Sequence, residues 1–348
     1  MQLGDNQPSD VQGGGTRYRD MLVHAFACMG TVVTFRIVGN ANSSTEQHAR
    51  SEAVTRATEW FRQIELSCNR FDSSSEVRKL SQHVGRPMRV SALLFQSVQF
   101  ALAVAEETSG AFDPSIGLRM EALGFDRDYR TGKSSGTNTD LLTDLKHSQA
   151  AHAEPRRRGD NERRAATFRD IELDEASQSI TLHAPLLLDL GAVAKGLAID
   201  VAAREFQPFE NFLVDAGGDV YVQGHNEHNE LWRIGIRHPR IADKLLQTLH
   251  VSNTAVCTSG DYERRVEATA EGHVVDARNG MPIHSIASIT VLASSAMVAD
   301  TLGTAAFSLG VHEGLALLER HGVDGLIVTP SIERFTTTHF PTEHTAVG

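Results

Sequence analysis

Two stretches of the chain carry residue types that could bind a phosphate group and a hard cation. Residues 186–200 read LLLDLGAVAKGLAID, an apolar run followed by small residues and then a helical pattern. The apolar run predicts a strand, and a strand that turns through small residues into a helix leaves the N–H groups of the first helical turn free to hold an anion. Lys195 adds a positive charge at that end, and Asp189 adds a carboxylate. The alternative is an ordinary strand–turn–helix in which glycine only allows close packing.

The second stretch is a predicted helix over residues 295–309. Asp300 and Thr304 lie four residues apart, so their side chains emerge on the same helical face. A carboxylate and a hydroxyl on an otherwise apolar helix suit Mg²⁺, which prefers oxygen ligands and often shares them with phosphate. Alternatively, Asp300 caps the helix or pairs with an arginine, and Thr304 bonds back to its own helical turn.

The elements that must position these residues are both helices and strands. Helical patterns follow a capping box predicted at Ser44 and Gln47 and a cap predicted at Ser91. Strands and helices do not alternate strictly, and residues 211–294 are mostly β in character. These patterns predict an α+β fold, with mixed or antiparallel sheets packed against helices in one large domain.

Composition limits the classes of function. The chain has 348 residues, of which 41% are apolar, enough for a sizeable core. A net charge of −11 argues against a nucleic-acid partner, because phosphate binding needs a basic surface. Cys28, Cys68 and Cys257 are widely spaced, which fits neither a zinc site nor a disulfide framework, so we expect buried thiols.

The ends of the chain and one internal segment are the polar parts. We expect a disordered tail over 1–20, a folded domain over 21–332 with a surface excursion at 126–170, and a loose tail over 333–348. The first twenty residues contain no apolar segment of a secretory signal and no cysteine that could take a lipid. No window is long enough for a transmembrane helix, so we expect a cytoplasmic protein without a membrane segment.

Seven short motifs, in their order along the chain, resemble those of the ApbE-type flavin transferases, the FAD:protein FMN transferases. The resemblance covers roughly residues 21 to 330 and implies the T-fold-like core of that family. The motifs are Met29-Gly30-Thr31, Gly110-Ala-Phe-Asp113-Pro, Asp189-Leu-Gly-Ala-Val-Ala-Lys195-Gly, Asp215-Ala-Gly-Gly-Asp219, Ser259-Gly260-Asp-Tyr262, His273-Val-Val-Asp276 and Ser295-Ala-Met-Val-Ala-Asp300-Thr-Leu-Gly-Thr304.

The resemblance implies roles for the residues at matching positions. Asp300 and Thr304 match metal ligands, and the third protein ligand would be the main-chain carbonyl of Ala192. His273 matches a histidine proposed to deprotonate the incoming hydroxyl, and Asp276 could orient it or bind the water shell of the metal. The residues that match FAD contacts are Met29, Phe71, Ala111, Phe112, Asp113, Asp189, Lys195 and Val275.

The reaction implied by the resemblance is Mg²⁺-dependent and uses FAD as its substrate. The FMN half of FAD moves to a Thr or Ser hydroxyl of a partner flavoprotein, as a phosphoester, and AMP is released. Two alternatives stay open from the sequence. With water as the acceptor the protein would be an FAD pyrophosphatase, and without turnover it would be an FAD-binding protein.

Overall fold

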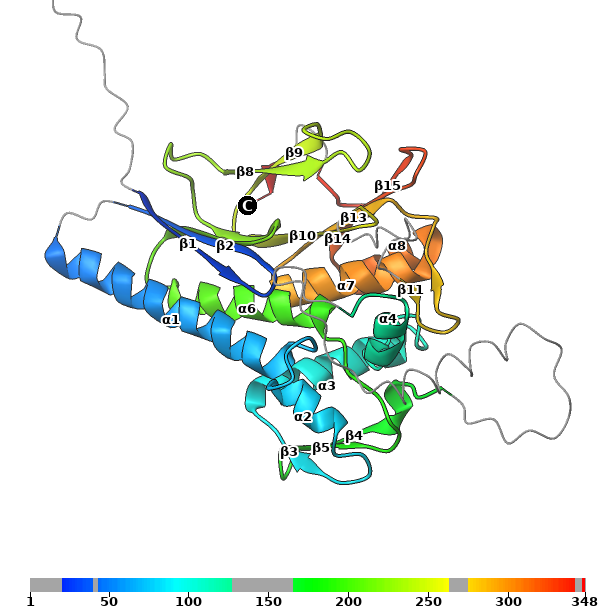
Figure 1. Cartoon of the computed structure of the whole chain (residues 1–348). Helices are drawn as coiled ribbons and strands as arrows, with labels where there is room; N and C mark the ends of the chain where they lie inside the picture. Colours follow the sequence, from blue (N-terminus) through cyan, green and yellow to red (C-terminus); the bar gives the residue numbers. More distant parts are fainter. Residues whose placement is uncertain (1–20, 40–42, 127–164, 263–274, 342–345, 348) are drawn as a thin grey trace, which may run out of the picture.

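An eight-stranded antiparallel sheet forms the centre of the protein, seen edge-on above the helices in Figure 1. The structure is a computed structural model that describes residues 21–39, 43–126, 165–262, 275–341 and 346–347. In spatial order the strands are β1 (Met21–Cys28), β2 (Thr31–Val38), β6 (Asn211–Ala216), β7 (Asp219–Gln223), β10 (Thr254–Gly260), β13 (Ser288–Ala293), β14 (Asp324–Val328) and β15 (Arg334–Thr336).

Three smaller sheets surround the central one. The first contains β3 (Met88–Arg89), β5 (Ser179–Leu182) and β4 (Ile171–Asp174). The second contains β8 (Trp232–Arg237), β9 (Leu245–Val251) and β16 (Ala346–Val347), and the third pairs β11 (Val275–Asp276) with β12 (Met281–Pro282).

The helices cover one face of the central sheet, and β8 and β9 lie over the other face (Figure 1). A 3₁₀ turn, η2, spans Phe168–Asp170. The α-helices are α1 (Ser44–Cys68), α2 (Glu76–Ser81), α3 (Ala92–Glu107), α4 (Gly117–Ala122), α6 (Gly191–Glu205), α7 (Ala296–Leu309) and α8 (Val311–Arg320).

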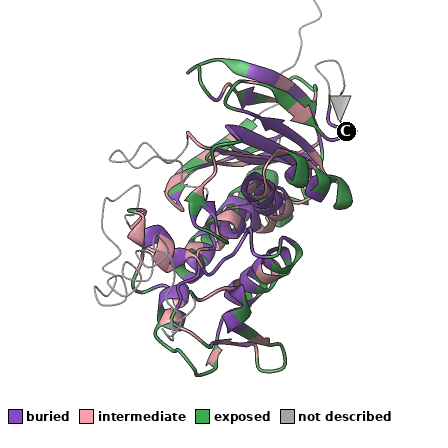
Figure 2. Cartoon of the chain, turned by 90° about the vertical axis from the view of Figure 1, so that its right-hand side faces the viewer, coloured by how far each residue is buried: buried purple, intermediate pink, exposed green. Residues whose placement is uncertain are grey.

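Apolar residues on the two faces of the sheet form two separate cores. In β10, Ala255 and Cys257 belong to the core on the helical side, whereas Val256 belongs to the core under β8 and β9. This division follows from the two-residue period of a strand. Figure 2 shows the central helices and the adjoining strands largely as buried residues. Helices α6 and α7 are therefore held between the sheet and the outer helices.

Two features fix α7 against α6. A side chain at Gly196 would place its Cβ 2.5 Å from the carbonyl oxygen of Ala296, so only glycine permits this approach. Asp200 of α6 accepts hydrogen bonds from the Ser295 hydroxyl at 2.6 Å and from the N–H groups of Ala296 and Met297 at 2.7 and 3.0 Å. These bonds satisfy donors that a helix start otherwise leaves without partners.

The predicted α+β class is confirmed, as is the cap at Ser91, whose hydroxyl accepts from the Leu94 N–H at 3.2 Å. The first cap was predicted one residue too late, because Ser43 and not Ser44 accepts from the Glu46 N–H. The apolar run 186–188 is buried but forms only a single bridge, between Leu187 and Ile116, rather than a strand.

The polar segments are only partly described. Residues 334–336 and 346–347, within the segment expected to be a loose C-terminal tail, form β15 and β16. The N-terminal tail 1–20 lies outside the described residues, and so does 127–164, most of the expected excursion. At the end of that excursion, residues 168–170 form η2, directly before β4.

Candidate active site

A lysine and two aspartates meet where the first turns of α6, the middle of α7 and the start of β7 come together. Lys195 Nζ donates to Oδ2 of Asp219 at 2.5 Å and to Oδ2 of Asp300 at 2.7 Å. The side chains of Lys195, Asp219 and Asp300 are 19%, 7% and 6% exposed. The second oxygen of Asp219 accepts from the Thr258 N–H of β10 at 3.0 Å. Two carboxylates thus converge on one cation, largely shielded from water.

These charges also determine the protonation of their neighbours. Burial by itself lowers the pKa of Lys195, but the carboxylates of Asp219 and Asp300 outweigh burial and raise that pKa above its ordinary value. The lysine is therefore an ammonium ion. Burial, together with the same two carboxylates, raises the pKa of the Cys257 thiol well above its ordinary value. Cys257 is accordingly an unreactive thiol, and Cys28 and Cys68 are buried thiols, as expected.

The carbonyl of Ala192 also faces α7. It accepts a hydrogen bond from the Thr301 hydroxyl at 2.9 Å, and Thr301 directly follows Asp300. Thr304 lies one turn further along α7, with its Oγ1 3.4 Å from the Ser259 hydroxyl of β10. The structure therefore brings Ala192, Lys195 and Asp300 together, although they come from segments about a hundred residues apart in sequence.

A second charged cluster surrounds Asp189. Its Oδ2 accepts from Arg70 Nε at 2.9 Å, and its Oδ1 accepts from the Gly191 N–H at 3.0 Å. One of the N–H groups expected to be free at the start of α6 therefore already has a partner. The guanidinium carbon of Arg70 lies 4.1 Å from the centre of the Phe71 ring, so Arg70 links two of the predicted site residues. Glu121, with no exposed side-chain surface, lies 3.9 Å from Arg70.

The loop that contains Ala111, Phe112 and Asp113 connects this cluster to β11. The carboxylate of Asp113 accepts from the N–H groups of Ser115 at 2.8 Å and Phe168 at 3.0 Å. Burial raises the pKa of Asp113 above its ordinary value, and those two hydrogen bonds oppose the effect. Beside it, the Pro114 carbonyl accepts from the Asp189 N–H, and the Ala111 carbonyl accepts from the Ala277 N–H.

The loop thereby places its FAD-contact candidates between Asp189 and β11, the strand that contains the buried Val275. Asp276, the next residue, forms an ion pair with Arg278 at 2.9 Å and also accepts from the Asn279 side chain at 3.2 Å. His273, the predicted base, lies outside the described residues. Met29 lies at the turn between β1 and β2, where its N–H donates to Glu65 at 2.8 Å.

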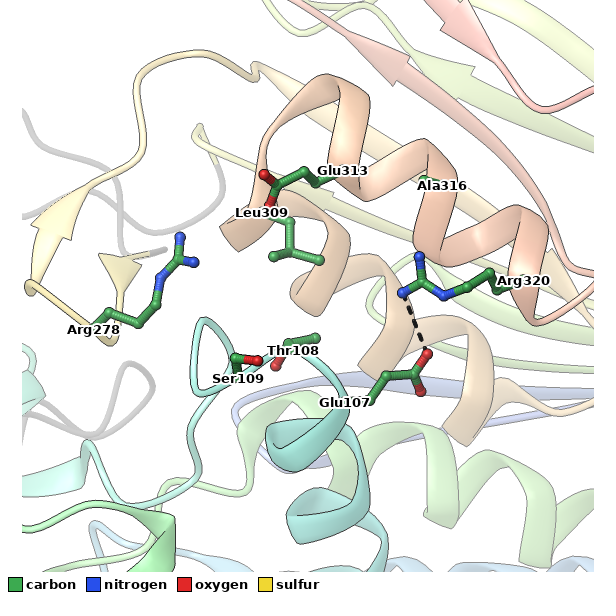
Figure 3. Close-up of a pocket in the computed structure, with 8 residues that line it drawn as sticks. All are labelled: Glu107, Thr108, Ser109, Arg278, Leu309, Glu313, Ala316 and Arg320. Atoms are coloured by element: carbon green, nitrogen blue, oxygen red, sulfur yellow. Dashed lines mark hydrogen bonds and ion pairs between the residues drawn. The ribbon is translucent and has the colours of Figure 1, made fainter.

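Figure 3 shows a pocket of about 280 Å³ beside this loop. The end of α3 at Glu107–Ser109 forms one side, Arg278 approaches from the β11 segment, and Glu313 and Arg320 come from α8. Arg320 is paired with Glu107 across the pocket at 3.4 Å. The described lining contains none of the predicted site residues, although Ser109 and Arg278 each lie two residues from one of them.

Two residues of these clusters were not selected from the sequence. Asp219 was quoted only as part of a motif, because its pairing with Lys195 depends on β7 lying beside α6. Arg70 precedes Phe71, but a single arginine at the end of a helix gives no distinguishing pattern. Each becomes visible only when the chain is folded.

The cluster at Lys195 has the chemistry of a cation site, because an ammonium ion already bridges two carboxylates there. The described residues contain no group of three or more His, Cys, Asp and Glu side chains that could hold a metal by themselves. Oxygen ligands from a carbonyl and a hydroxyl, such as those of Ala192 and Thr304, would have to complete the set. Among the described helices, none is sufficiently long and apolar to cross a bilayer.

Comparisons with known proteins agree on one family. The sequence model of the ApbE family matches residues 29–327. The chain is 28% identical to the FAD:protein FMN transferase of Vibrio cholerae over 88% of this chain and 87% of the relative. It is 29% identical to the protein of the same name from Treponema pallidum, over 91% of this chain and 87% of the relative.

Solved structures show the same fold. The ApbE protein of Thermotoga maritima superposes with a TM-score of 0.74 at 26% identity, covering 92% of this chain and 97% of that one. The flavin transferase ApbE of Vibrio cholerae superposes with a TM-score of 0.74 at 23% identity, covering 92% and 98%.

Proposed function

Because the chain belongs to the ApbE family, we propose that it is a flavin transferase that moves the FMN half of FAD onto a partner flavoprotein. The acceptor group is a Thr or Ser hydroxyl, the product is a phosphoester, and AMP is the leaving group. The observation that supports a phosphoryl-transfer site best is the cation held between Asp219 and Asp300, next to the Ala192 carbonyl. A pyrophosphate substrate needs positive charge beside it, which Lys195 and a divalent cation on Asp300 would supply together.

Mg²⁺ is the metal that the proposed site would hold, through Asp300, Thr304 and the carbonyl of Ala192. When bound, it supplies Lewis-acid polarisation of the pyrophosphate and neutralises charge on the departing AMP. Lys195 contributes a second positive charge from the first turns of α6. Together the two cations would place three positive charges beside the two negative charges of the FAD pyrophosphate and the carboxylates of Asp219 and Asp300.

The remaining candidates have binding and positioning roles. Phe71, with the Arg70 guanidinium against its ring, offers a surface on which a flavin or adenine ring can stack. Asp189, Ala111, Phe112, Asp113 and Val275 lie along one connected path from α6 to β11. We assign these residues, with Met29, to FAD binding.

Proton transfer completes the reaction. The acceptor oxygen forms a bond to the FMN phosphorus, and the bond from that phosphorus to the bridging oxygen of AMP breaks. The hydroxyl proton passes to His273, whose ordinary pKa lies close to neutrality. Asp276, three residues further on, would orient His273. A site that admits water as well as the acceptor would also hydrolyse FAD to FMN and AMP.

Mass spectrometry of the acceptor tests this function. The protein is incubated with FAD, MgCl₂ and a candidate acceptor flavoprotein domain, and the intact acceptor is weighed. We expect a mass increase of one FMN less one water, which is lost when the acceptor Thr is changed to Val or when EDTA is added. FMN and AMP in equal amounts without acceptor labelling would identify a pyrophosphatase instead. Absence of AMP release would identify an FAD-binding protein.

A further inference from the structure

We propose that Lys195 is the resident counter-ion of the metal site, which an incoming divalent cation displaces from Asp300 while Asp219 retains the ammonium. This inference rests on the metal dependence of the proposed function. Its basis is one ammonium group shared by two buried carboxylates, at 2.5 Å from Asp219 and 2.7 Å from Asp300. The lysine neutralises a site that would otherwise contain two adjacent buried negative charges.

The two carboxylates are not equivalent in their surroundings. Asp219 lies at the start of β7, and its other oxygen accepts from the Thr258 N–H of β10 at 3.0 Å. This bond anchors Asp219 to the sheet. Asp300 lies on α7, where the neighbouring Thr301 hydroxyl contacts the Ala192 carbonyl. The carbonyl of the proposed metal site therefore contacts the residue that follows Asp300, and Asp219, anchored to the sheet, is the carboxylate better placed to keep the lysine.

The ammonium of Lys195 and the metal would compete for the same carboxylate. Lys195 donates to Oδ2 of Asp300, an oxygen of the carboxylate assigned to the metal. Ala192 and Lys195 come from neighbouring turns of α6, so both the carbonyl and the ammonium approach α7 from the same side. A divalent cation on Asp300 would face the ammonium at close range, and that repulsion favours movement of Lys195 away from Asp300.

The exchange would also change the net charge of the site, and with it the attraction of the site for the substrate. Before metal entry, two carboxylates and one ammonium leave a net charge of −1, which repels a pyrophosphate. After entry of a divalent cation the sum is +1, which attracts it. The lysine would then be available to a phosphate oxygen, since one of its two carboxylate partners is occupied. Metal binding would thus prepare the site for FAD.

Manganese titration tests the exchange. Free Mn²⁺ is measured by electron paramagnetic resonance as it is titrated, without FAD or acceptor, into the full chain and its Lys195→Met, Asp219→Asn and doubly substituted variants. The matched control is Arg56→Met, which removes a cation from the exposed pair with Glu205 at the other end of α6. Circular dichroism and thermal unfolding verify the fold of each variant.

We expect Lys195→Met to bind Mn²⁺ roughly tenfold or more tightly than the wild type, because the competing ammonium is gone. Asp219→Asn should bind Mn²⁺ more weakly, since the lysine then pairs with Asp300 alone. The double variant should bind more tightly than Asp219→Asn, and Arg56→Met should match the wild type. An unchanged or weaker affinity in Lys195→Met would overturn the proposal.

Lys195→Met would leave the carboxylates of Asp219 and Asp300 to repel each other. If this variant does not fold for that reason, the double variant, Lys195→Met with Asp219→Asn, still tests the proposal. In that variant only one carboxylate remains, so no such repulsion exists. An affinity equal to that of Asp219→Asn would mean that Asp219 is a direct metal ligand and that the lysine does not compete. Because the acceptor is absent, these results are independent of flavin transfer, which succeeds or fails in the labelling assay.

Discussion

Asp300 is the residue on which the proposed chemistry depends most directly. Its side chain is 6% exposed, it contacts Lys195, and the following residue contacts the carbonyl of Ala192. In the proposed metal site, an acidic ligand in this place would hold the metal by charge as well as by geometry. The neutral amide of asparagine has the same shape but lacks that charge.

Asp300→Asn is expected to lower the rate of flavin transfer at least about a hundredfold, the cost of losing one strong electrostatic contact to the transition state. The rate is measured from acceptor labelling at saturating FAD and limiting Mg²⁺. Asp174→Asn, at the exposed last residue of β4, is the control and should transfer at the wild-type rate. Full activity of Asp300→Asn under metal limitation would remove Asp300 from the metal site.

Arg70 is expected to be the most important structural cation near the site. It is 6% exposed, it pairs with Asp189, and it lies against the Phe71 ring. Arg70→Met should lower the free energy of unfolding by about 3 kcal/mol, because it removes a buried cation that lies close to Glu121 and pairs with Asp189. Urea denaturation measures the change. Arg56→Met removes an exposed pair and should change the free energy of unfolding much less, so equal effects would refute the assignment.

Site residues whose pattern depends on nearby positions could be predicted from the sequence. Pairs of residues that are distant in the chain could not. Asp300 and Thr304 stood out because four-residue spacing on a helix is a local property. Asp219 did not, because its partner Lys195 is 24 residues away and across an element boundary. Arg70 meets Asp189 across 119 residues, a distance over which spacing gives no information.

The contact between α6 and α7 is the element-scale feature that assembles the site. Gly196 lets the two backbones approach, and Asp200 supplies acceptors for the first N–H groups of α7. The pairing sets Ala192 and Lys195 opposite Asp300. A change that separates these helices should therefore damage the metal site and the fold together.

Two helical glycines provide a matched test of this contact. Gly196→Ala should lower the free energy of unfolding by about 2 kcal/mol or more, because its Cβ would lie 2.5 Å from the Ala296 carbonyl oxygen. In Gly303→Ala the new Cβ would meet Val291 at 3.4 Å, and alanine also favours the helix by about 1 kcal/mol. Thermal and urea unfolding compare them. Equal stability of the two variants would show that the α6–α7 approach tolerates a side chain.

Helix starts were the most predictable elements, because a cap is defined within four residues. Ser91 caps α3 as predicted, and Ser295 caps the helix that contains Asp300. The run Leu186–Leu188 was predicted as a strand from its apolar character alone. Burial explains that character equally well, and only one bridge forms there.

At the scale of the whole molecule, segments distant in sequence build one sheet and one site. Strand β2 pairs with β6, and β7 pairs with β10, so the central sheet places α6 and α7 side by side beneath it. The α+β class followed from the content of strands and helices. The order of the strands did not, because non-local pairing leaves no signature in a single sequence.

Ligand binding should stabilise the whole fold if the site joins α6, α7 and the sheet. FAD with Mg²⁺ at a hundred times its dissociation constant should add about 2.7 kcal/mol to the free energy of unfolding. EDTA should remove most of that gain, because in the proposed site the metal would link FAD to Asp300. Thermal unfolding with FAD alone, Mg²⁺ alone and both gives the comparison. A stabilisation by FAD that is insensitive to EDTA would contradict a metal-linked site.

Crystallography with FAD and Mn²⁺ tests the central claim most directly, because anomalous scattering locates the metal without reference to activity. The account predicts one strong anomalous peak bonded to the Asp300 carboxylate and the Ala192 carbonyl, with the FAD pyrophosphate on its open side and Lys195 no longer on Asp300. A peak away from both residues, or a bound FAD with Lys195 still bridging Asp219 and Asp300, would contradict it.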